Sequence, residues 1–571
     1  MFRLKHYISP YYGYILLTVL IKLLGAVMEL MVPYLMEILL DVKIATGDMS
    51  QICLCGGGML LCAAACLGCN ILANRMSAIS SGRITKAVRH DLFQKLQHLS
   101  VRQMDGLTVS SAESRLTSDT YNFNQLLARV QRLGIRAPIL LVGGVAMMMS
   151  MDAVLALVLL ALLPIIAVVV YFVTKTSVPL YTKQQEILDT VVRTVQENIT
   201  GIRVIKALSK TEYEKCRFNT VNEKLTATDQ KAAVITAISN PTASLTLNLG
   251  LTLVVVIGAY RVNSGAILSG VIVAFLQYFT MILNAMLGVT RIFVIWSKGE
   301  ASANRVADVL EMPEDMTVLP AAEPEQNAPH IEFRNVNFSY TGIGKNIDDL
   351  SFRLEHGQTL GILGPTGSGK STIINLLLRF YDPDSGSVLI DGQDVRTIPY
   401  EILRKKFGVV FQNDFLTEGS MAGNIGFFRE MEEPSLHRAA RNAQADFIYE
   451  KGGLDAEVVV RGNNLSGGQK QRLLIARALA DDPEILILDD SSSALDYQTD
   501  SRLRQALRQN YRSTTTVLVA QRVSSLRHAD LILVLHDGTV IGAGDHDHLM
   551  NTCDEYRIIA QTQMGDGKEV L

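Results

Sequence analysis

A glycine-rich segment in the second half of the chain carries the residue types that hold the phosphates of a nucleotide. It runs Gly364-Pro-Thr-Gly-Ser-Gly-Lys370-Ser371, after the apolar run Thr359–Leu363 and before the helical run Thr372–Phe380. Glycines let backbone N–H groups wrap phosphate oxygens, and the helix that follows directs its positive end at them. Lysine in this place neutralises the β- and γ-phosphates, and the serine hydroxyl binds Mg²⁺. The pattern predicts an ATP site with Mg²⁺ at Ser371.

A second run supplies acids for the same chemistry. Glu484–Leu488 reads as a buried parallel strand, and Asp489 and Asp490 follow it. Asp489 at the carboxyl end of such a strand is placed as a second Mg²⁺ ligand. The segment Leu465–Gln469 lies between the two motifs, and this position gives weight to a short Gly-rich pattern that would be weak alone.

The rest of the chain must position this site, and much of it is suited to a membrane. A length of 571 residues exceeds one hydrophobic core, so at least two domains are expected. The chain is 48% hydrophobic and 19% charged, against about 25% charged in soluble domains. Its 53 Lys and Arg nearly balance 56 Asp and Glu, which argues against a nucleic-acid partner.

Long apolar runs in the first half predict six membrane spans in the lipid bilayer. The connections 73–136 and 173–241 each hold ten Lys and Arg, whereas the opposite connections hold only Lys43 and Arg261. The positive-inside rule therefore places the N-terminus, the long connections and the second half in the cytoplasm, and the long connections are expected to be helical extensions. The predicted spans cover about 11–40, 49–74, 137–150, 153–172, 242–260 and 266–290.

The first span carries charges that have two interpretations. Lys22, Glu29 and Glu37 fall within about 80° of one another on a helix. Intramembrane charges usually face a bundle interior or a wet cavity, so Glu29 is a candidate contact for cationic cargo. An internal ion pair, or a span end that reaches water, explains the same residues equally well.

The composition changes after residue 310. Residues 311–329 are acidic and proline-rich, which is typical of a linker. Short β-rich runs then alternate with helical runs from 330 to 571, the pattern of an α/β domain. The predicted fold is an α-helical transmembrane domain over 1–310, followed by the linker and an α/β P-loop nucleotide-binding domain over 330–571.

With these motifs in order, the whole chain resembles the half-transporters of the ATP-binding cassette (ABC) exporters. Leu465-Ser-Gly-Gly-Gln469 resembles the family's signature motif, Gln412 its Q-loop glutamine, and Ser493–Asp496 its D-loop. The resemblance implies two nucleotide domains that enclose two ATPs head to tail, and it implies Mg²⁺ held by Ser371, Gln412 and Asp489. It implies ATP contacts from Tyr340, Gly364, Pro365, Thr366, Gly367, Ser368, Gly369, Lys370, Ser371, Thr372, Leu465, Ser466, Gly467, Gly468, Gln469 and Asp496.

Two positions depart from the family pattern. Asp490 stands where the family usually has the glutamate that polarises the attacking water, and Gln521 stands where it usually has a histidine at the γ-phosphate. An amide donates a hydrogen bond but neither titrates nor carries positive charge. The catalytic set Asp490, Gln521 and Gln412 is therefore interpreted as a degenerate site that holds ATP and cleaves it slowly.

The intact signature would serve the ATP site of a partner. This asymmetry resembles one subunit of a heterodimeric bacterial multidrug exporter in the cell membrane, which moves small amphipathic substrates. Two alternatives stay open: a homodimer that slowly exports lipid or peptide, and a membrane protein that uses ATP binding as a regulatory switch.

Overall fold

Two compact units make up the chain. The computed structural model describes residues 2–564 apart from 321–324, 326 and 413, so part of the predicted linker lies outside the described residues. One unit comprises Met1–His98 and Thr108–Met312, and the other comprises Leu99–Leu107 and Pro313–Leu571. The short stretch Leu99–Leu107 therefore groups with the second half of the chain, not with its sequence neighbours.

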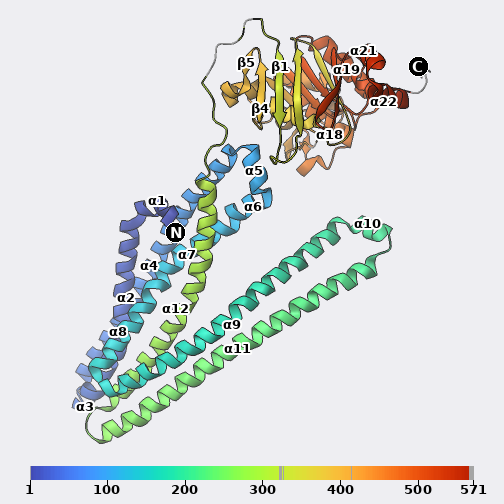
Figure 1. The fold of residues 1–571 in the computed structure, drawn as a ribbon. Helices are drawn as coiled ribbons and strands as arrows, with labels where there is room; N and C mark the ends of the chain where they lie inside the picture. Colours follow the sequence, from blue (N-terminus) through green and yellow to red (C-terminus); the bar gives the residue numbers. More distant parts are fainter. Residues whose placement is uncertain (1, 321–324, 326, 413, 565–571) are drawn as a thin grey trace. The chain divides into compact units, whose positions relative to one another are not determined.

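The first unit is entirely helical (Figure 1). π-Helical turns at Leu39–Lys43, Arg115–Asp119 and Val130–Gly134 link several of its helices. The helices are α1 (Lys5–Ile8), α2 (Tyr12–Ile38), α3 (Ile44–Thr46), α4 (Met49–His98), α6 (Val109–Ser114), α7 (Thr120–Arg129), α8 (Ile135–Met151), α9 (Ala153–Thr200), α10 (Ile202–Ala207), α11 (Thr211–Asn263) and α12 (Ser269–Leu310).

Five helical stretches among the described residues are long and apolar enough to cross a membrane. A sixth, Ala153–Leu162, is apolar but shorter, and several side chains of the predicted span 153–172 lie outside the described residues. The helical membrane domain is thus confirmed, whereas the count of six spans stays a prediction. The five stretches are Lys5–Thr46, Met49–His98, Val109–Met151, Ser244–Asn263 and Ser269–Met286.

Aromatic residues of α12 fill the centre of this helical bundle. Phe275, Tyr278 and Phe279 are fully buried, and the Tyr278 hydroxyl donates to the Leu30 carbonyl over 2.7 Å. These side chains therefore pack helices together and do not line an open surface of the chain.

Helices α9 and α11 form a long antiparallel pair that α10 closes (Figure 1). Large apolar side chains near the closed end face solvent in the single chain, among them Ile199, Val204 and Leu208. Exposed apolar side chains of this kind are typical of interaction surfaces.

The second unit contains two main sheets. Antiparallel strands form a four-stranded sheet in the order β2-β1-β4-β5, and a mostly parallel six-stranded sheet has the order β12-β11-β3-β10-β9-β6. The strands are β1 (Ile331–Phe338), β2 (Ile347–Leu354), β3 (Thr359–Leu363), β4 (Ser385–Ile390), β5 (Gln393–Asp394), β6 (Phe407–Val410), β7 (Gly419–Ser420), β8 (Glu457–Val458), β9 (Ile485–Asp489), β10 (Thr515–Val519), β11 (Leu531–His536) and β12 (Thr539–Gly544).

Helices cover the six-stranded sheet, whose central strands are buried. Ile485–Asp489 is buried at every position, as expected of a parallel strand packed on both faces. The helices are α13 (Lys370–Leu377), α14 (Tyr400–Lys405), α15 (Met421–Gly426), α16 (Glu433–Asn442), α17 (Phe447–Glu450), α18 (Gly467–Leu479), α19 (Tyr497–Asn510), α20 (Val523–Leu526), α21 (His546–Thr552) and α22 (Asp554–Met564).

Helix α5 (Val101–Leu107) packs on this unit. Val101 contacts its main hydrophobic core, and the Tyr381 hydroxyl donates to Asp105. The Ser100 hydroxyl donates to Asp315 over 2.8 Å. A turn from the first half of the chain is thus anchored beside the strands that carry the nucleotide motifs.

One buried acid of β1 gives the second unit a pH-dependent stability. The Glu332 side chain is 3% exposed and accepts hydrogen bonds from Arg334 at 2.6 Å and Arg353 at 2.7 Å, which hold its pKa below the ordinary value of 4.5. A depressed folded-state pKa contributes stability that is present above pH about 4.5 and is lost as the pH falls through the folded pKa.

We expect Glu332→Gln to lower the free energy of unfolding by about 1.5–3 kcal/mol at pH 7, because it removes a charged partner of two guanidinium groups. The difference from the parent chain should shrink as the pH falls below 4.5. Thermal melts between pH 4 and 7 test this, with the exposed Glu401→Gln as the matched control. Equal offsets at both ends of the range would contradict the linkage.

Candidate functional site

Neighbouring strands bring the predicted site residues to one edge of the six-stranded sheet. Strand β10 lies between β3 and β9, with Val519 paired to both Ile362 and Asp489. The carboxyl ends of parallel strands meet at the same edge. The glycine-rich loop after β3, Gln521 after β10 and the acids at the end of β9 therefore lie together, although Ser371 and Asp489 are 118 positions apart in the sequence.

The loop between β3 and α13 has the form of a phosphate cradle. Gly367 and Gly369 have φ angles of +88° and +99°, which residues with a side chain rarely adopt. The Lys370 ammonium donates to the carbonyls of Gly364 at 2.9 Å and Pro365 at 2.7 Å, so it is held inside the curve of the loop. The Ser368 hydroxyl is buried there without a partner among the described residues. The Lys370 ammonium and the unpaired Ser368 hydroxyl both indicate that the loop binds an anion.

Three charged groups share this buried edge. Burial lowers the pKa of Lys370 and raises the pKa of both Asp489 and Asp490. The positive charge of Lys370 acts against burial at both acids, because it lowers their pKa. The Ser371 hydroxyl donates to the Asp489 carboxylate over 3.2 Å. These oxygens are ligands that Mg²⁺ prefers, and Gln412 offers an amide oxygen nearby. The residues present thus fit a magnesium ion bound with phosphates.

The two departures from the family pattern contact each other. The Gln521 amide nitrogen donates to the Asp490 carboxylate over 3.4 Å, and Gln412 hydrogen-bonds the same carboxylate. Asp490 itself has a left-handed backbone with φ of +50°. The predicted catalytic set Asp490, Gln521 and Gln412 is therefore one hydrogen-bonded group, in which two neutral amides surround the acid.

Asp490 and Gln521 of this group border a cavity of about 470 Å³, which Arg522 and Gln563 also line. Arg522 lies close enough to Asp490 to pull its pKa downward, and Gln563 of α22 donates to the Gln521 carbonyl over 2.8 Å. Neither was predicted. Arg522 follows Gln521 directly and was open to prediction from that position, whereas Gln563 gives no signal in the sequence.

Tyr340 lies beside the helix that follows the loop. Its hydroxyl accepts a hydrogen bond from Asn375 at 2.9 Å and lies 3.4 Å from the Thr372 hydroxyl, and its ring is over a third exposed. An exposed aromatic face at this place can stack on a nucleotide base.

The signature segment opens helix α18. The Ser466 side chain caps the helix, and the Ser466 backbone N–H donates to the Gln469 amide oxygen over 3.0 Å, so the two residues form a capping box. Capping leaves Leu465 buried and Gly467 at the free N-terminus of the helix. Asp496 similarly caps α19 by accepting from Thr499. Both predicted segments thus present helix N-termini, which favour anions.

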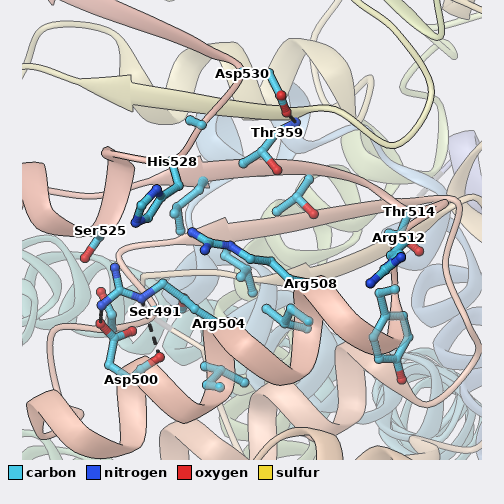
Figure 2. Close-up of a pocket in the computed structure, with 18 of the residues that line it drawn as sticks. Thr359, Ser491, Asp500, Arg504, Arg508, Arg512, Thr514, Ser525, His528 and Asp530 are labelled. Carbon is cyan, nitrogen blue, oxygen red and sulfur yellow. Dashed lines mark hydrogen bonds and ion pairs between the residues drawn. The ribbon is translucent and has the colours of Figure 1, made fainter. Parts of the chain in front are cut away.

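A separate cavity of about 290 Å³ lies between α19 and the sheet (Figure 2). Arg504 and Arg508 of α19, His528 and the β-strand residue Thr359 line it, and Arg504 pairs with Asp500 (Figure 2). None of the predicted site residues lines this cavity.

Glu29, the candidate cargo contact, belongs to the helical unit. Its carboxylate accepts two hydrogen bonds from Arg136, at 3.1 and 2.5 Å. Of the two interpretations given to the charges of the first span, the internal ion pair is the arrangement that Glu29 adopts.

A test of the cradle follows from the tight backbone at Gly364. A Cβ there would lie 2.5 Å from the Leu535 carbonyl oxygen and 2.6 Å from the Ser368 hydroxyl. We expect Gly364→Ala to displace the loop and to weaken ATP binding at least tenfold, or about 1.4 kcal/mol. The matched control is Gly426→Ala, whose Cβ would make only an ordinary 3.9 Å contact. Equilibrium binding of a fluorescent ATP analogue measures both; equal affinities would contradict the geometry.

Comparisons with known proteins agree with the site. A family model described as the ABC transporter transmembrane region matches residues 15–286, and one described as ABC transporter matches residues 347–493. The uncharacterized ABC transporter ATP-binding protein YfiB of Bacillus subtilis (strain 168) is 32% identical over 568 residues, 99% of each chain. YknU of the same strain is 32% identical over 574 residues, covering 100% of this chain and 98% of YknU.

The fold is also similar to a solved structure, that of a bacterial Atm1-family ABC exporter with ATP bound. The TM-score is 0.82 at 24% identity, over 98% of this chain and 100% of the other. The resemblance to the ABC exporters is confirmed, and so is the membrane location, whereas the heterodimeric, degenerate-site subtype stays a prediction. The chain belongs to the ABC transporter family, with a membrane-spanning region and an ATP-hydrolysing domain on one polypeptide that couple ATP hydrolysis to transport.

Proposed function

We propose that this chain is one subunit of a heterodimeric exporter, in which its own P-loop holds ATP and cleaves it slowly. The observation that carries the proposal is the contact between Asp490 and Gln521 at the mouth of the phosphate cradle. The signature motif, by contrast, is intact and well capped. The chain's own ATP site is thus altered, whereas the signature motif, which would serve the ATP site of a second chain, is preserved.

Slow cleavage follows from the lengths and charges of these side chains. Aspartate is one methylene shorter than glutamate, so its carboxylate lies back by about 1.5 Å. A misplacement of about 1 Å can cost ~10²-fold in rate. Gln521 is neutral, so it supplies no positive charge to the γ-phosphate in the transition state. Its amide also donates a hydrogen bond to the Asp490 carboxylate, in the place of an attacking water. Binding depends on other residues, chiefly Lys370 and the loop glycines, and is retained.

A second subunit is supported by the helical unit. The end of the α9–α11 pair exposes large apolar residues that the single chain leaves uncovered, including Val204 and Leu208. Glu197–Val204 lies at this end and resembles the cytoplasmic helices that pass motion to the membrane. An intact signature likewise has a role only opposite another P-loop.

In the proposed cycle, this chain's residues bind and orient ATP, and the ATP site of the partner's P-loop hydrolyses it. Lys370 and the loop N–H groups hold the phosphates; Ser371, Asp489 and Gln412 would hold magnesium, which neutralises phosphate charge when bound. ATP closes the two nucleotide domains and the membrane halves open outward. Hydrolysis at the site formed by the partner's P-loop and Ser466 of this chain resets the cycle.

The proposed setting is a bacterial cell membrane with the N-terminus and the nucleotide domain in the cytoplasm, and the cargo is a small amphipathic molecule. The linker 311–329 joins the membrane domain, 1–310, to the nucleotide domain, 330–571.

The test is to purify the chain alone and together with its partner, sought first in the neighbouring reading frame. We expect little ATPase activity from the lone chain and brisk activity from the pair. The pair should also move amphipathic probes into inside-out vesicles when ATP is present. Brisk hydrolysis by the lone chain, or a stable homodimer that transports, would contradict the heterodimer; ATP binding without vectorial transport would indicate a regulatory switch.

A further inference from the structure

We infer that a net positive polar seam inside the membrane domain receives the anionic group of the amphipathic cargo. The inference rests on the proposed transport function and assigns its substrate class. The polar seam joins α2, α4 and the region where α8 begins, and consists of Lys22, Glu29, Asn70, Asn74, Arg132 and Arg136.

The only acid of this seam is already neutralised. Arg136 donates from Nε to Glu29 Oε2 over 3.1 Å and from Nη2 to Oε1 over 2.5 Å. This two-point pairing uses both carboxylate oxygens, and the Glu29 side chain is 22% exposed. A cationic cargo would have to displace a guanidinium held in the strongest pairing geometry that proteins use.

The remaining cations of the seam donate hydrogen bonds only to neutral partners among the described residues. The Lys22 ammonium donates to the Asn70 amide oxygen over 2.5 Å and to Asn74 over 3.3 Å. Arg132 donates from Nε to the Ser77 hydroxyl over 3.3 Å. Three cations against one acid leave the seam with an excess of two positive charges.

Such an excess at membrane depth points to a counter-ion from outside the chain. Lys22 is 4% exposed and lies in the middle of α2, a helix apolar enough to span the bilayer. Charges in such segments face bundle interiors or cargo pathways and are paired there. Amide oxygens solvate an ammonium group but do not cancel its charge, so an anion would complete the seam.

Arg136 retains the means to bind that anion. Its side chain is 38% exposed, and its Nη1 atom has no hydrogen-bond partner among the described residues. A guanidinium presents parallel donors that match carboxylate, sulfonate or phosphate oxygens. Glu29 then acts as an internal counter-ion, which holds Arg136 in place until a cargo anion competes for it.

The test measures equilibrium binding without ATP, so that it does not depend on hydrolysis or transport. The purified full-length complex in phosphatidylcholine nanodiscs is titrated with three anionic amphipaths, taurocholate, dodecyl sulfate and lysophosphatidic acid, and with the cation tetraphenylphosphonium. We expect at least one anion to bind tenfold or more tighter than the cation. Absence of binding by all three anions, or tighter binding of the cation, would overturn the inference.

Substitutions distinguish the two cargo classes more sharply, because replacing Glu29 should change the affinity for an anionic cargo and for a cationic cargo in opposite directions. Glu29→Gln should strengthen anion binding severalfold by freeing Arg136, whereas a cation site would lose affinity. Lys22→Gln and Arg136→Gln should each weaken anion binding about tenfold, and Lys22→Arg should retain it. The matched control is Asp152→Asn, which breaks the comparable 2.5 Å pair with Arg261 outside the seam and should change nothing. Unchanged affinity in both glutamine variants of the cations would overturn the assignment.

A further arm identifies the source of the anion. Nanodiscs that contain phosphatidylglycerol should compete with the soluble anion if the seam binds a membrane lipid, and should not compete if it selects a soluble amphipath. Either result supports an anion site, whereas loss of anion selectivity in both lipid compositions would contradict it. Vesicle transport that fails while binding persists would count against the proposed function and leave the anion site in place.

Discussion

Changing Asp490 to Glu together with Gln521 to His is expected to raise the ATP turnover of the isolated chain by about two orders of magnitude. The longer acid recovers about 1.5 Å of reach toward a water, and displacement of about 1 Å costs ~10²-fold. Removing Gln521 also frees the Asp490 position from the amide that now donates to it over 3.4 Å. Phosphate release under steady-state conditions measures the gain.

The controls separate catalysis from folding and binding. Adding Lys370→Ala to the double variant should abolish the gain, because the phosphates lose their lysine. Each single change should give less than the pair, since the two side chains contact each other and are not independent. A double variant that folds and binds ATP but shows no increase would place the defect elsewhere and contradict the interpretation of these two residues.

The second large effect is expected at the signature motif. Ser466→Asp keeps a good helix cap, because aspartate caps as well as serine, but it directs a negative charge at the partner's γ-phosphate. We expect the heterodimer to lose about 10²-fold of its ATPase rate, the size of effect seen when one transition-state hydrogen-bond donor is removed. The neutral cap Ser466→Asn is the matched variant and should retain more activity.

The same complex carrying Asp490→Asn should lose less than about twofold, because this chain's own site contributes little turnover in the proposed cycle. The informative quantity is the difference between the ATPase losses caused by the substitutions at Ser466 and Asp490. Equal losses from Ser466→Asp and Asp490→Asn would mean that both ATP sites turn over alike, and the asymmetric assignment would be wrong.

The nucleotide motifs were open to prediction because their function demands a fixed local order. A strand, a glycine-rich turn and a helix must follow one another directly, so Thr359–Leu363 and Lys370 could be placed from spacing alone. The membrane domain was equally visible in its long apolar runs. Its helices extend beyond those runs, as α4 does from Met49 to His98, since polar residues with helical spacing continue them.

Pairings between distant segments were not open to prediction. Periodicity places Glu29 on a face of α2 but does not say that Arg136, 107 residues away, lies opposite it. The sequence left a cargo contact and an internal ion pair equally open at Glu29, and it did not identify the partner. The grouping of Leu99–Leu107 with the nucleotide domain is likewise a tertiary result, because its helix of seven residues has no distinctive pattern.

The asymmetry between the two ATP sites is tested most directly by the state of the nucleotide in each site of the working complex. The heterodimer is turned over with 8-azido-ATP labelled at either the α- or the γ-phosphate and is then photo-crosslinked. We expect this chain, labelled near Tyr340, to retain both the α and the γ label because its ATP is intact, whereas the partner retains only the α label. Equal loss of the γ label from both chains would contradict it.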